Sequence, residues 1–210
     1  MKIIADENIN AVICLSDGSF FFGKGAGSRG ETIGEICFNT SVTGYQEILT
    51  DPSYAGQIIT FTFPHIGNVG CNDVDNESSK PHCKGLVIRD EITEDSNFRS
   101  NINLNKWLCK NNLTAICNVD TRRLTKNIRD KGARNSIIFF TKIGEEIDTD
   151  KLISKIIDLP TLKNVDLASE VTTRKKYFWD QKLYDLLELK YFTINPDQKK
   201  YKVTIIDYGI

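Results

Sequence analysis

The sequence is poor in the residues from which many active sites are built. Its 210 residues include only two histidines, His65 and His82, and its six cysteines form no Cys-x-x-Cys pair. Zinc sites and dithiol redox sites usually show such closely spaced ligands, so neither kind of site is expected. The 27 Lys and Arg residues nearly balance the 28 Asp and Glu residues. No overall field therefore favours binding to nucleic acid or to an anionic membrane.

Long apolar runs are also absent. The apolar start "MKII" is broken at once by the polar residues 6–8, so we expect no targeting segment, and no other run approaches the length of a membrane span. We expect a cytoplasmic protein with reduced cysteines. Four of them stand in apolar contexts and are expected to be buried: Cys14, Cys37, Cys109 and Cys117.

Turn residues and hydrophobic periodicity predict that strands come first along the chain. Residues 11–23 are typical of a hairpin around Asp17-Gly18, a preferred tight-turn dipeptide. Residues 57–64 alternate apolar residues with Thr60 and Thr62, which predicts a strand buried on one face only. Two further short strands are expected at 34–39 and 83–90.

Strands and helices then alternate. The spacing of Leu104, Trp107 and Leu108 predicts a helix within 103–112, and a second helix is expected to begin at Asp120 or Thr121 and to end at Gly132. The remaining expected elements are strands at 113–119 and 134–140 and a helix at 148–160. This order favours an α/β fold, in the sense of an α+β layered domain with a three-layer β/β/α-like arrangement.

The character of the chain changes after residue 172. Residues 173–200 are charged and aromatic, with a break at Asn195-Pro196, and are interpreted as a connecting segment. Residues 201–210 contain an apolar run, 203–206, followed by Asp207 and Gly209, which is how an α/β domain usually begins. The expected organisation is a first domain at 1–172, a connector at 173–200, and at 201–210 the first strand of a second domain.

Two stretches, one glycine-rich and one acidic, resemble ligand-binding loops only in part. Residues 25–30, "GAGSRG", match the dinucleotide pattern G-x-G-x-x-G, but the sequence that follows is strand-like, whereas that mechanism needs a helix. A glycine-rich turn between strands, built on Gly25, Gly27 and Gly30, is favoured. The spacing of Asp73, Asp75 and Glu77 resembles the first part of a calcium-binding loop. Ser78 and Lys84, however, stand where such a loop has a Gly and a Glu, so a polar loop is favoured.

The remaining candidate site residues also have a purely structural explanation. His65 and His82 fit no standard zinc spacing, and structural hydrogen bonds by His65 at a strand end are favoured. Residues 121–134 carry six basic side chains, which would suit nucleic acid. The absence of interleaved aromatics favours a solvated helix face, or one docked on an acidic partner.

The densest polar stretch is 39–57, "NTSVTGYQEILTDPSYAGQ". It is rich in hydroxyls and amides but has no histidine or cysteine, so nothing in it could activate a nucleophile. Ser53 follows Pro52, whose ring fixes the backbone of the turn. A hydroxyl held in this way can donate to a carboxylate without a catalytic base, although serine in such a turn often only caps it.

Several stretches together resemble one family. They are the run from Phe38 to Asp90, which contains "TGYQEILTDPSY" and "PHIGN", and the later stretches "SNFRS", "NVDTRRLTKNIRDKGARNSII" and "VDLASEVT". In this order and spacing they are similar to the small chain of glutamine-dependent carbamoyl-phosphate synthase, from about Val12 to the end of the chain.

The resemblance implies a ligase complex. In that family the first domain of the small chain docks on a large synthetase chain, and the second is a class I glutamine amidotransferase domain that releases ammonia from glutamine. The large chain, with ATP and Mg²⁺, uses the ammonia and bicarbonate to make carbamoyl phosphate for arginine and pyrimidine biosynthesis. The expected partners are therefore the large chain, the amidotransferase domain and glutamine, in a heterodimer.

The resemblance implies one substrate contact in this chain and no catalytic residue. Ser53 matches the serine that reaches the glutamine pocket, so Ser53 is the expected substrate-binding residue. The family's nucleophile lies in a Gly-x-Cys-x-Gly elbow, which none of the six cysteines matches. We therefore expect no catalytic, cofactor-binding or metal-binding residue here, and no glutaminase activity from these residues alone. A stand-alone, non-catalytic interaction domain of the same ancestry is the alternative.

Overall fold

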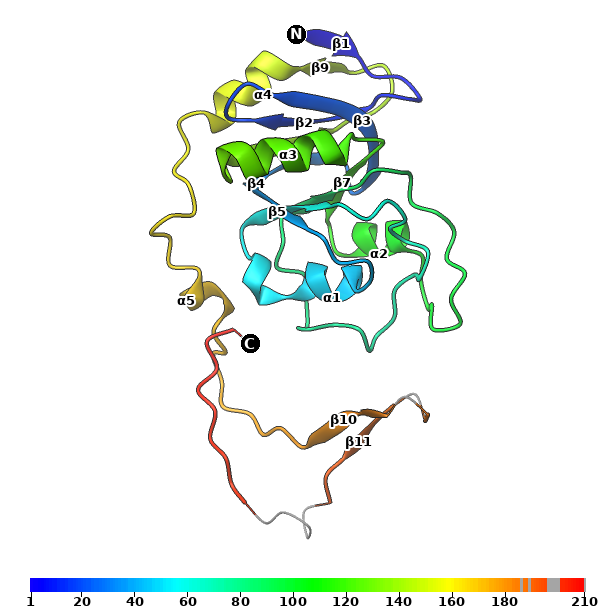
Figure 1. The fold of residues 1–210 in the computed structure, drawn as a ribbon, viewed down its shortest axis with the longest axis vertical. Coiled ribbons are helices and arrows are strands. Elements are labelled where there is room, and N and C mark those ends of the chain that lie inside the picture. The colour runs from blue at the N-terminus through cyan, green and yellow to red at the C-terminus, as the bar shows by residue number, and fades with distance from the viewer. Residues whose placement is uncertain (186, 189, 196–200, 210) are drawn as a thin grey trace. The chain divides into compact units, whose positions relative to one another are not determined.

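The computed structural model describes residues 1–185, 187–188, 190–195 and 201–209, and the chain divides into two compact units (Figure 1). The first unit runs from Met1 to Leu167 and the second from Ala168 to Ile210. The fold is mixed α/β, as the sequence predicts. No helix among the described residues is both long enough and apolar enough to cross a membrane.

The first unit is built around a sheet that closes on itself. Seven strands form this closed barrel, in the order β2 (Ala11–Leu15), β3 (Phe20–Gly27), β7 (Thr114–Cys117), β6 (Gly85–Val87), β5 (Gln57–Phe61), β4 (Gly30–Asn39) and β8 (Asn135–Phe140). A separate antiparallel pair joins β1 (Lys2–Ile4) to β9 (Glu146–Asp148). Closure leaves the seven strands without an exposed edge, which removes a common site of aggregation.

Helices lie in two of the three connections between parallel strands of the barrel, and the connection from β5 to β6 has none. The pairs β4–β5, β5–β6 and β6–β7 are parallel, and parallel neighbours cannot be joined by a tight hairpin. The helix α1 (Tyr45–Thr50) and the 3₁₀ turn η1 (Pro52–Tyr54) connect β4 to β5, and α2 (Leu104–Lys110) lies between β6 and β7 in sequence. The connection from β7 to β8 is α3 (Thr121–Lys131), and α4 (Thr149–Ile156) follows β9.

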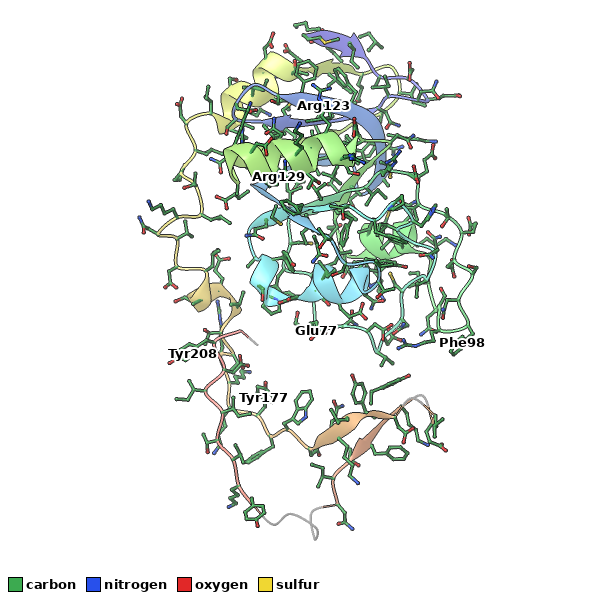
Figure 2. The ribbon with its side chains drawn as sticks, in the orientation of Figure 1. Glu77, Phe98, Arg123, Arg129, Tyr177 and Tyr208 are labelled. Carbon is green, nitrogen blue, oxygen red and sulfur yellow. The ribbon has the colours of Figure 1, made fainter. Side chains whose placement is uncertain are left out.

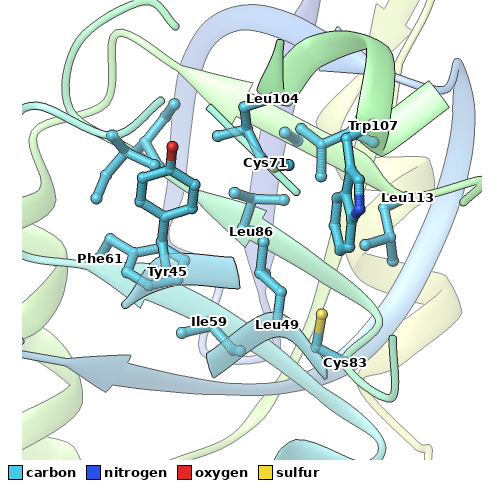
Figure 3. Packing of buried hydrophobic residues seen from close by; sticks show 14 of the residues in the cluster. Tyr45, Leu49, Ile59, Phe61, Cys71, Cys83, Leu86, Leu104, Trp107 and Leu113 are labelled. Atoms are coloured by element: carbon cyan, nitrogen blue, oxygen red, sulfur yellow. The ribbon is translucent and has the colours of Figure 1, made fainter. Parts of the chain in front are cut away.

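Helices α1 and α2 pack on one side of the barrel strands. Tyr45 and Leu49 of α1 belong to one core cluster with Trp107 and other α2 side chains, and barrel residues such as Leu86 lie between them (Figure 3). A second cluster joins Leu124 of α3 to apolar side chains of the barrel strands. A third joins α4 to β2 and β8. The structure is thus layered, with helices covering a curved central sheet.

The local signals at the Asp17-Gly18 turn and at both ends of α3 are confirmed, whereas other elements, such as β6 and α4, are shorter than expected. The Asp17-Gly18 turn joins β2 to β3, with Gly18 at φ 86°. The Asp120 carboxylate accepts a hydrogen bond from the Arg123 backbone at 2.9 Å and caps α3, and Gly132 ends that helix at φ 85°. These features depend only on neighbouring residues, which is why the sequence predicts them.

Two expectations about burial are wrong. Strand β5 is not half-buried: Ile58, Ile59 and Thr60 are all fully buried, because β5 pairs with β4 and β6 and is covered on both faces. Cys109 is exposed rather than buried. It lies in α2 on the side away from Leu104 and Leu108, which face the core. Cys14 and Cys117 are buried and Cys37 is half-buried.

The second unit has little interior. Its elements are α5 (Ala168–Val171) and the antiparallel hairpin of β10 (Gln181–Asp185) and β11 (Lys190–Thr193), so a hairpin stands within the region interpreted as a connector. None of its described residues is buried. Leu183, for example, is 93% exposed. A unit with this surface gains little from the hydrophobic effect by itself.

The strand expected at 203–206 is not formed. These residues pair with no strand in the described part of the chain, and Val203 and Ile206 are exposed. A strand needs a neighbour for its backbone N–H and C=O groups, and no neighbour is supplied here. The domain assignments at 1–172, 173–200 and 201–210 stay predictions; Pro196, the boundary at residue 200 and residue 210 lie outside the described residues.

Truncation of one central side chain tests the core cluster. Leu86 of β6 is fully buried, so Leu86→Ala should lower the free energy of unfolding by about 2–5 kcal/mol. The same change at the exposed Leu183 should alter it by less than about 0.5 kcal/mol. Urea denaturation of both variants measures the difference, and equal effects would contradict the assigned core.

Asp17 ties the β2–β3 turn to the end of α3. Its carboxylate accepts hydrogen bonds from Lys131 at 3.1 Å and Arg134 at 2.5 Å. Partial burial raises the pKa of Asp17, but the hydrogen bonds from Ser19 and Lys131 and the charge of Arg134 outweigh this and lower it to about 2.

This pKa shift predicts a pH-dependent stabilisation. Because folding lowers the pKa of a carboxyl group, the stabilisation is present above its unfolded value, near 4, and is lost as the pH falls towards 2. Asp17→Asn should cost about 1 kcal/mol at pH 7 and progressively less below pH 4. Urea unfolding at several pH values tests this, with the exposed Asp158→Asn as control; a cost that is unchanged at low pH would refute it.

Candidate functional site

The polar segment 39–57 folds into a short helix and a tight turn that present Ser53 to solvent. Pro52 begins the 3₁₀ turn η1, and the Asp51 carboxylate accepts a hydrogen bond from the Ser53 backbone at 2.8 Å. The Tyr54 hydroxyl accepts from the Asn39 amide at 2.9 Å, which ties the turn to the end of β4. The turn is therefore fixed at three places around Ser53.

The Ser53 side chain has no structural role in this turn. Asp51, rather than Ser53, caps η1. Ser53 is exposed, and its hydroxyl forms no hydrogen bond with any other residue in the described part of the chain. The geometry thus leaves a fixed backbone carrying a free hydroxyl, which is what a contact to an external ligand requires.

Buried polar side chains of α1 hold the loop that follows β5. The Gln46 amide donates to the Asn72 backbone carbonyl and, at 2.8 Å, to the Asn76 side chain, and it accepts from the Asn72 backbone N–H at 2.9 Å. The Thr50 hydroxyl accepts from the Glu77 backbone at 2.9 Å. These bonds satisfy polar groups that would otherwise be buried without partners.

The acidic loop is held by contacts within the chain. Asp75 accepts from the Asn72 side chain at 2.8 Å and forms an ion pair with Arg99. Asp73 and Glu77 are exposed. No group of three or more potential metal ligands occurs in the described residues. The interpretation of Asp73, Asp75 and Glu77 as members of a polar loop agrees with these contacts.

The glycine-rich stretch is a turn between strands. Gly25 and Gly27 belong to β3 and Gly30 begins β4, so no helix starts inside the motif. A Cβ atom at Gly25 would stand 2.1 Å from the Phe140 ring, and Gly27 has φ 70°, so both positions favour glycine for structural reasons. The turn favoured from the sequence is confirmed.

Five of the six thiols are not set up as nucleophiles. Burial raises the pKa of Cys14, Cys37, Cys71, Cys83 and Cys117 to about 12. A cysteine nucleophile reacts as its thiolate, and these five stay protonated at neutral pH.

The two histidines differ in their burial and in their neighbours. Burial lowers the pKa of His82, and the charge of Lys80 adds to that effect. His65 is exposed and lies edge-on to the Phe63 ring, at 5.9 Å between centroids. The role predicted for His65 was hydrogen bonding at a strand end; the contact that the structure shows is this aromatic one.

One polar cavity was not foreseen from the sequence. It has a volume of about 260 Å³ and is lined by Thr43, Glu47, Val69, Asp75 and Arg99, among others. Burial raises the pKa of Glu47, and the nearby charges of Asp75 and Glu77 add to this, whereas Arg99 acts against it. The sequence signal for this cavity is the stretch "SNFRS". Its arginine, Arg99, forms an ion pair with Asp75 only in the folded chain.

Comparison with known proteins decides the family. Residues 13–138 match the family model described as carbamoyl-phosphate synthase small chain, CPSase domain. This chain belongs to that family. It is 46% identical over 200 residues to the carbamoyl phosphate synthase small chain of Escherichia coli O6:H1, covering 95% of this chain and 52% of that relative.

Further relatives give the same result. The carbamoyl phosphate synthase small chains of Yersinia pestis, over 96% of this chain and 51% of the relative, and of Pseudomonas putida, over 95% and 52%, are each 45% identical to it. The chain thus spans about half the length of the curated relatives it matches. The family match covers the barrel from β2 into β8, including α1, η1 and α3.

The family-like motifs meet around α1. The Tyr45 hydroxyl, from "TGYQ", donates to the Gly70 carbonyl, from "PHIGNVG", at 2.6 Å. Ile66 of the same loop is buried in the core cluster with Tyr45. Motifs separated in the sequence therefore form one structural unit, and Ser53 lies on the turn at the end of it.

The Gln46 hydrogen bonds can be tested by mutation. Gln46→Ala leaves buried backbone groups of Asn72 without partners, so the free energy of unfolding should fall by about 2–3 kcal/mol. Gln181→Ala removes an exposed amide and should have an effect within about 0.5 kcal/mol. Chemical denaturation measures both, and a Gln46→Ala variant as stable as the parent would show that the loop does not depend on this side chain.

Proposed function

We propose that these residues form the first domain of the small, glutamine-using chain of carbamoyl-phosphate synthase, and that Ser53 contacts the glutamine substrate. Family membership supports the enzyme complex, and the similarity to small chains over 95% of this sequence supports the subunit. The observation that carries the role of Ser53 is its free hydroxyl on a turn capped by Asp51.

The chemistry suits the head group of an amino acid. A hydroxyl can donate to a carboxylate and accept from an ammonium group, and a turn held by Pro52, Asp51 and Tyr54 needs little reordering on binding. A hydrogen bond to a charged group contributes about 1.5–3 kcal/mol. Ser53 is therefore a binding residue, and no bond-making step is assigned to it.

Glutamine hydrolysis itself is assigned to an amidotransferase domain that these residues do not contain. The five buried thiols with pKa near 12 support this division of labour. The ammonia would pass to a large synthetase chain that carries ATP and Mg²⁺ and converts bicarbonate to carbamoyl phosphate. Unpaired cysteines throughout the sequence agree with a cytoplasmic enzyme.

Substitution of Ser53 in the complete small chain, assembled with its large chain, tests this role. Ser53→Ala should raise KM for glutamine about 10- to 100-fold, which corresponds to the loss of one hydrogen bond to a charged group. Synthesis from free ammonia should be unchanged, because it bypasses the glutamine pocket. Steady-state rates with glutamine and with ammonia separate the two, and the exposed Ser96→Ala is the matched control.

Two results would count against the proposal, and a third would reveal a folding defect of the variant. An unchanged KM for glutamine would remove Ser53 from the pocket while leaving the enzyme assignment intact. An equal loss with glutamine and with ammonia would point to a folding defect instead. Failure of the complete small chain to support glutamine-dependent synthesis with any large chain would favour a stand-alone interaction domain.

A further inference from the structure

The outer face of α3 carries a stripe of positive charge. Arg122, Lys126 and Arg129 are spaced by four and three residues, so they follow one side of the helix, and all three are exposed. Over seven residues the stripe extends for about 10 Å. Figure 2 shows Arg129 and the neighbouring Arg123 on this helix.

Cations at the end of α3 are matched by acids, but most of this stripe is not. Lys131 and Arg134 share Asp17, as described above. Arg129 meets its sequence neighbour Asp130 at 3.0 Å. Arg122 and Lys126 have no carboxylate partner within the part of the chain that the structure describes. The acids Asp17 and Asp130 are thus paired with other cations than Arg122 and Lys126.

Helix stability gives no reason for Arg122, Arg123 and Lys126, whereas Arg129, in the last turn of α3, suits the helix dipole. Arg122 and Arg123 lie in the first turn of α3, where the helix dipole disfavours positive charge. Arg122 and Lys126 are like charges four residues apart, an arrangement that also disfavours a helix. Acidic residues in the first turn would stabilise α3 better.

Arg123 is held in place beside the stripe. Its guanidinium lies over the Phe21 ring, 5.1 Å from the centroid. Stacking of this kind leaves the planar edge of the group free to bind carboxylate oxygens in pairs. The face therefore offers one pre-positioned arginine next to three exposed cations.

The surroundings of the stripe select the kind of partner. A helix that binds a membrane surface needs exposed apolar side chains, but the apolar residues Leu124 and Ile128 of α3 are buried. Extended basic patches with aromatics suit nucleic acid, whereas this stripe is short, lacks exposed aromatics and belongs to a chain of net charge −1. Carboxylates on a protein surface fit the spacing and the chemistry.

We propose that Arg122, Lys126 and Arg129, with Arg123 beside them, form a docking face for an acidic patch of the large synthetase chain. This inference rests on the proposed function, which supplies the partner but names no contact residues. Charges at the rim of an interface act mainly on the rate of association and on its salt dependence. The complex should therefore form faster at low salt than at high salt.

Charge reversal on α3 tests the docking face. The double variant Arg122→Glu/Lys126→Glu, in the complete small chain, should bind the large chain at least about tenfold more weakly at low salt. It should also lose most of the salt dependence of the association rate. Surface plasmon resonance with immobilised large chain measures both quantities.

A matched control separates the face from the change in net charge. Lys106 and Lys110 are exposed on α2 at the same spacing of four residues, so Lys106→Glu/Lys110→Glu changes the charge equally. This variant should bind within about twofold of the parent. Thermal unfolding of the α3 variant should occur at the same or a higher temperature, because Arg122→Glu places a carboxylate at the favourable end of the helix dipole.

The outcomes distinguish the inference from the proposed function. Parent-like binding of the α3 variant to the large chain overturns the inference alone. Equal weakening by both double variants overturns it as well, since only net charge would then matter. No binding by the parent protein overturns both proposals. Salt-sensitive binding of a labelled single-stranded DNA of about 20 nucleotides, lost in the α3 variant, would assign the face to nucleic acid instead.

Discussion

The arrangement of the candidate site depends on the buried polar face of α1. This helix is only six residues long, too short to be stable by propensity alone, and its polar residues Gln46 and Thr50 are buried. They are satisfied by the loop at 72–78, which in turn is held by the Asp75–Arg99 ion pair. Loss of one bond leaves another buried group without a partner, so helix and loop are ordered together.

The turn that carries Ser53 follows directly from this unit. Asp51 ends α1 and caps η1, so the position of the turn is set by the helix before it and by the Asn39–Tyr54 bond to β4. The barrel provides the rigid support, because β4 and β5, on either side of the turn, are parallel neighbours within a closed sheet. A flexible side chain on a fixed backbone is a suitable arrangement for recognising a small ligand.

The two proposed interaction sites lie on different connections of the barrel. Ser53 belongs to the crossover from β4 to β5, and the basic stripe belongs to the crossover from β7 to β8. In both cases the connection buries apolar residues and presents polar ones to solvent. The buried residue is, for example, Leu49 in the first connection and Leu124 in the second. One scaffold can therefore carry a ligand contact and a protein contact that vary independently.

The sequence by itself determined the features that depend on neighbouring residues and on motif. The Asp17-Gly18 turn, the Asp120 cap, the end of α3 at Gly132 and the resemblance to the family are of this kind. Tertiary structure alone decided the closure of the sheet, the burial of both faces of β5, the exposure of Cys109 and the absence of a strand at 203–206. The cap that Asp51 gives to η1 is a local feature too, although the sequence left open whether Ser53 caps that turn. The physical reason is that a turn or cap is satisfied within a few residues, whereas strand pairing and burial depend on partners far away in the chain.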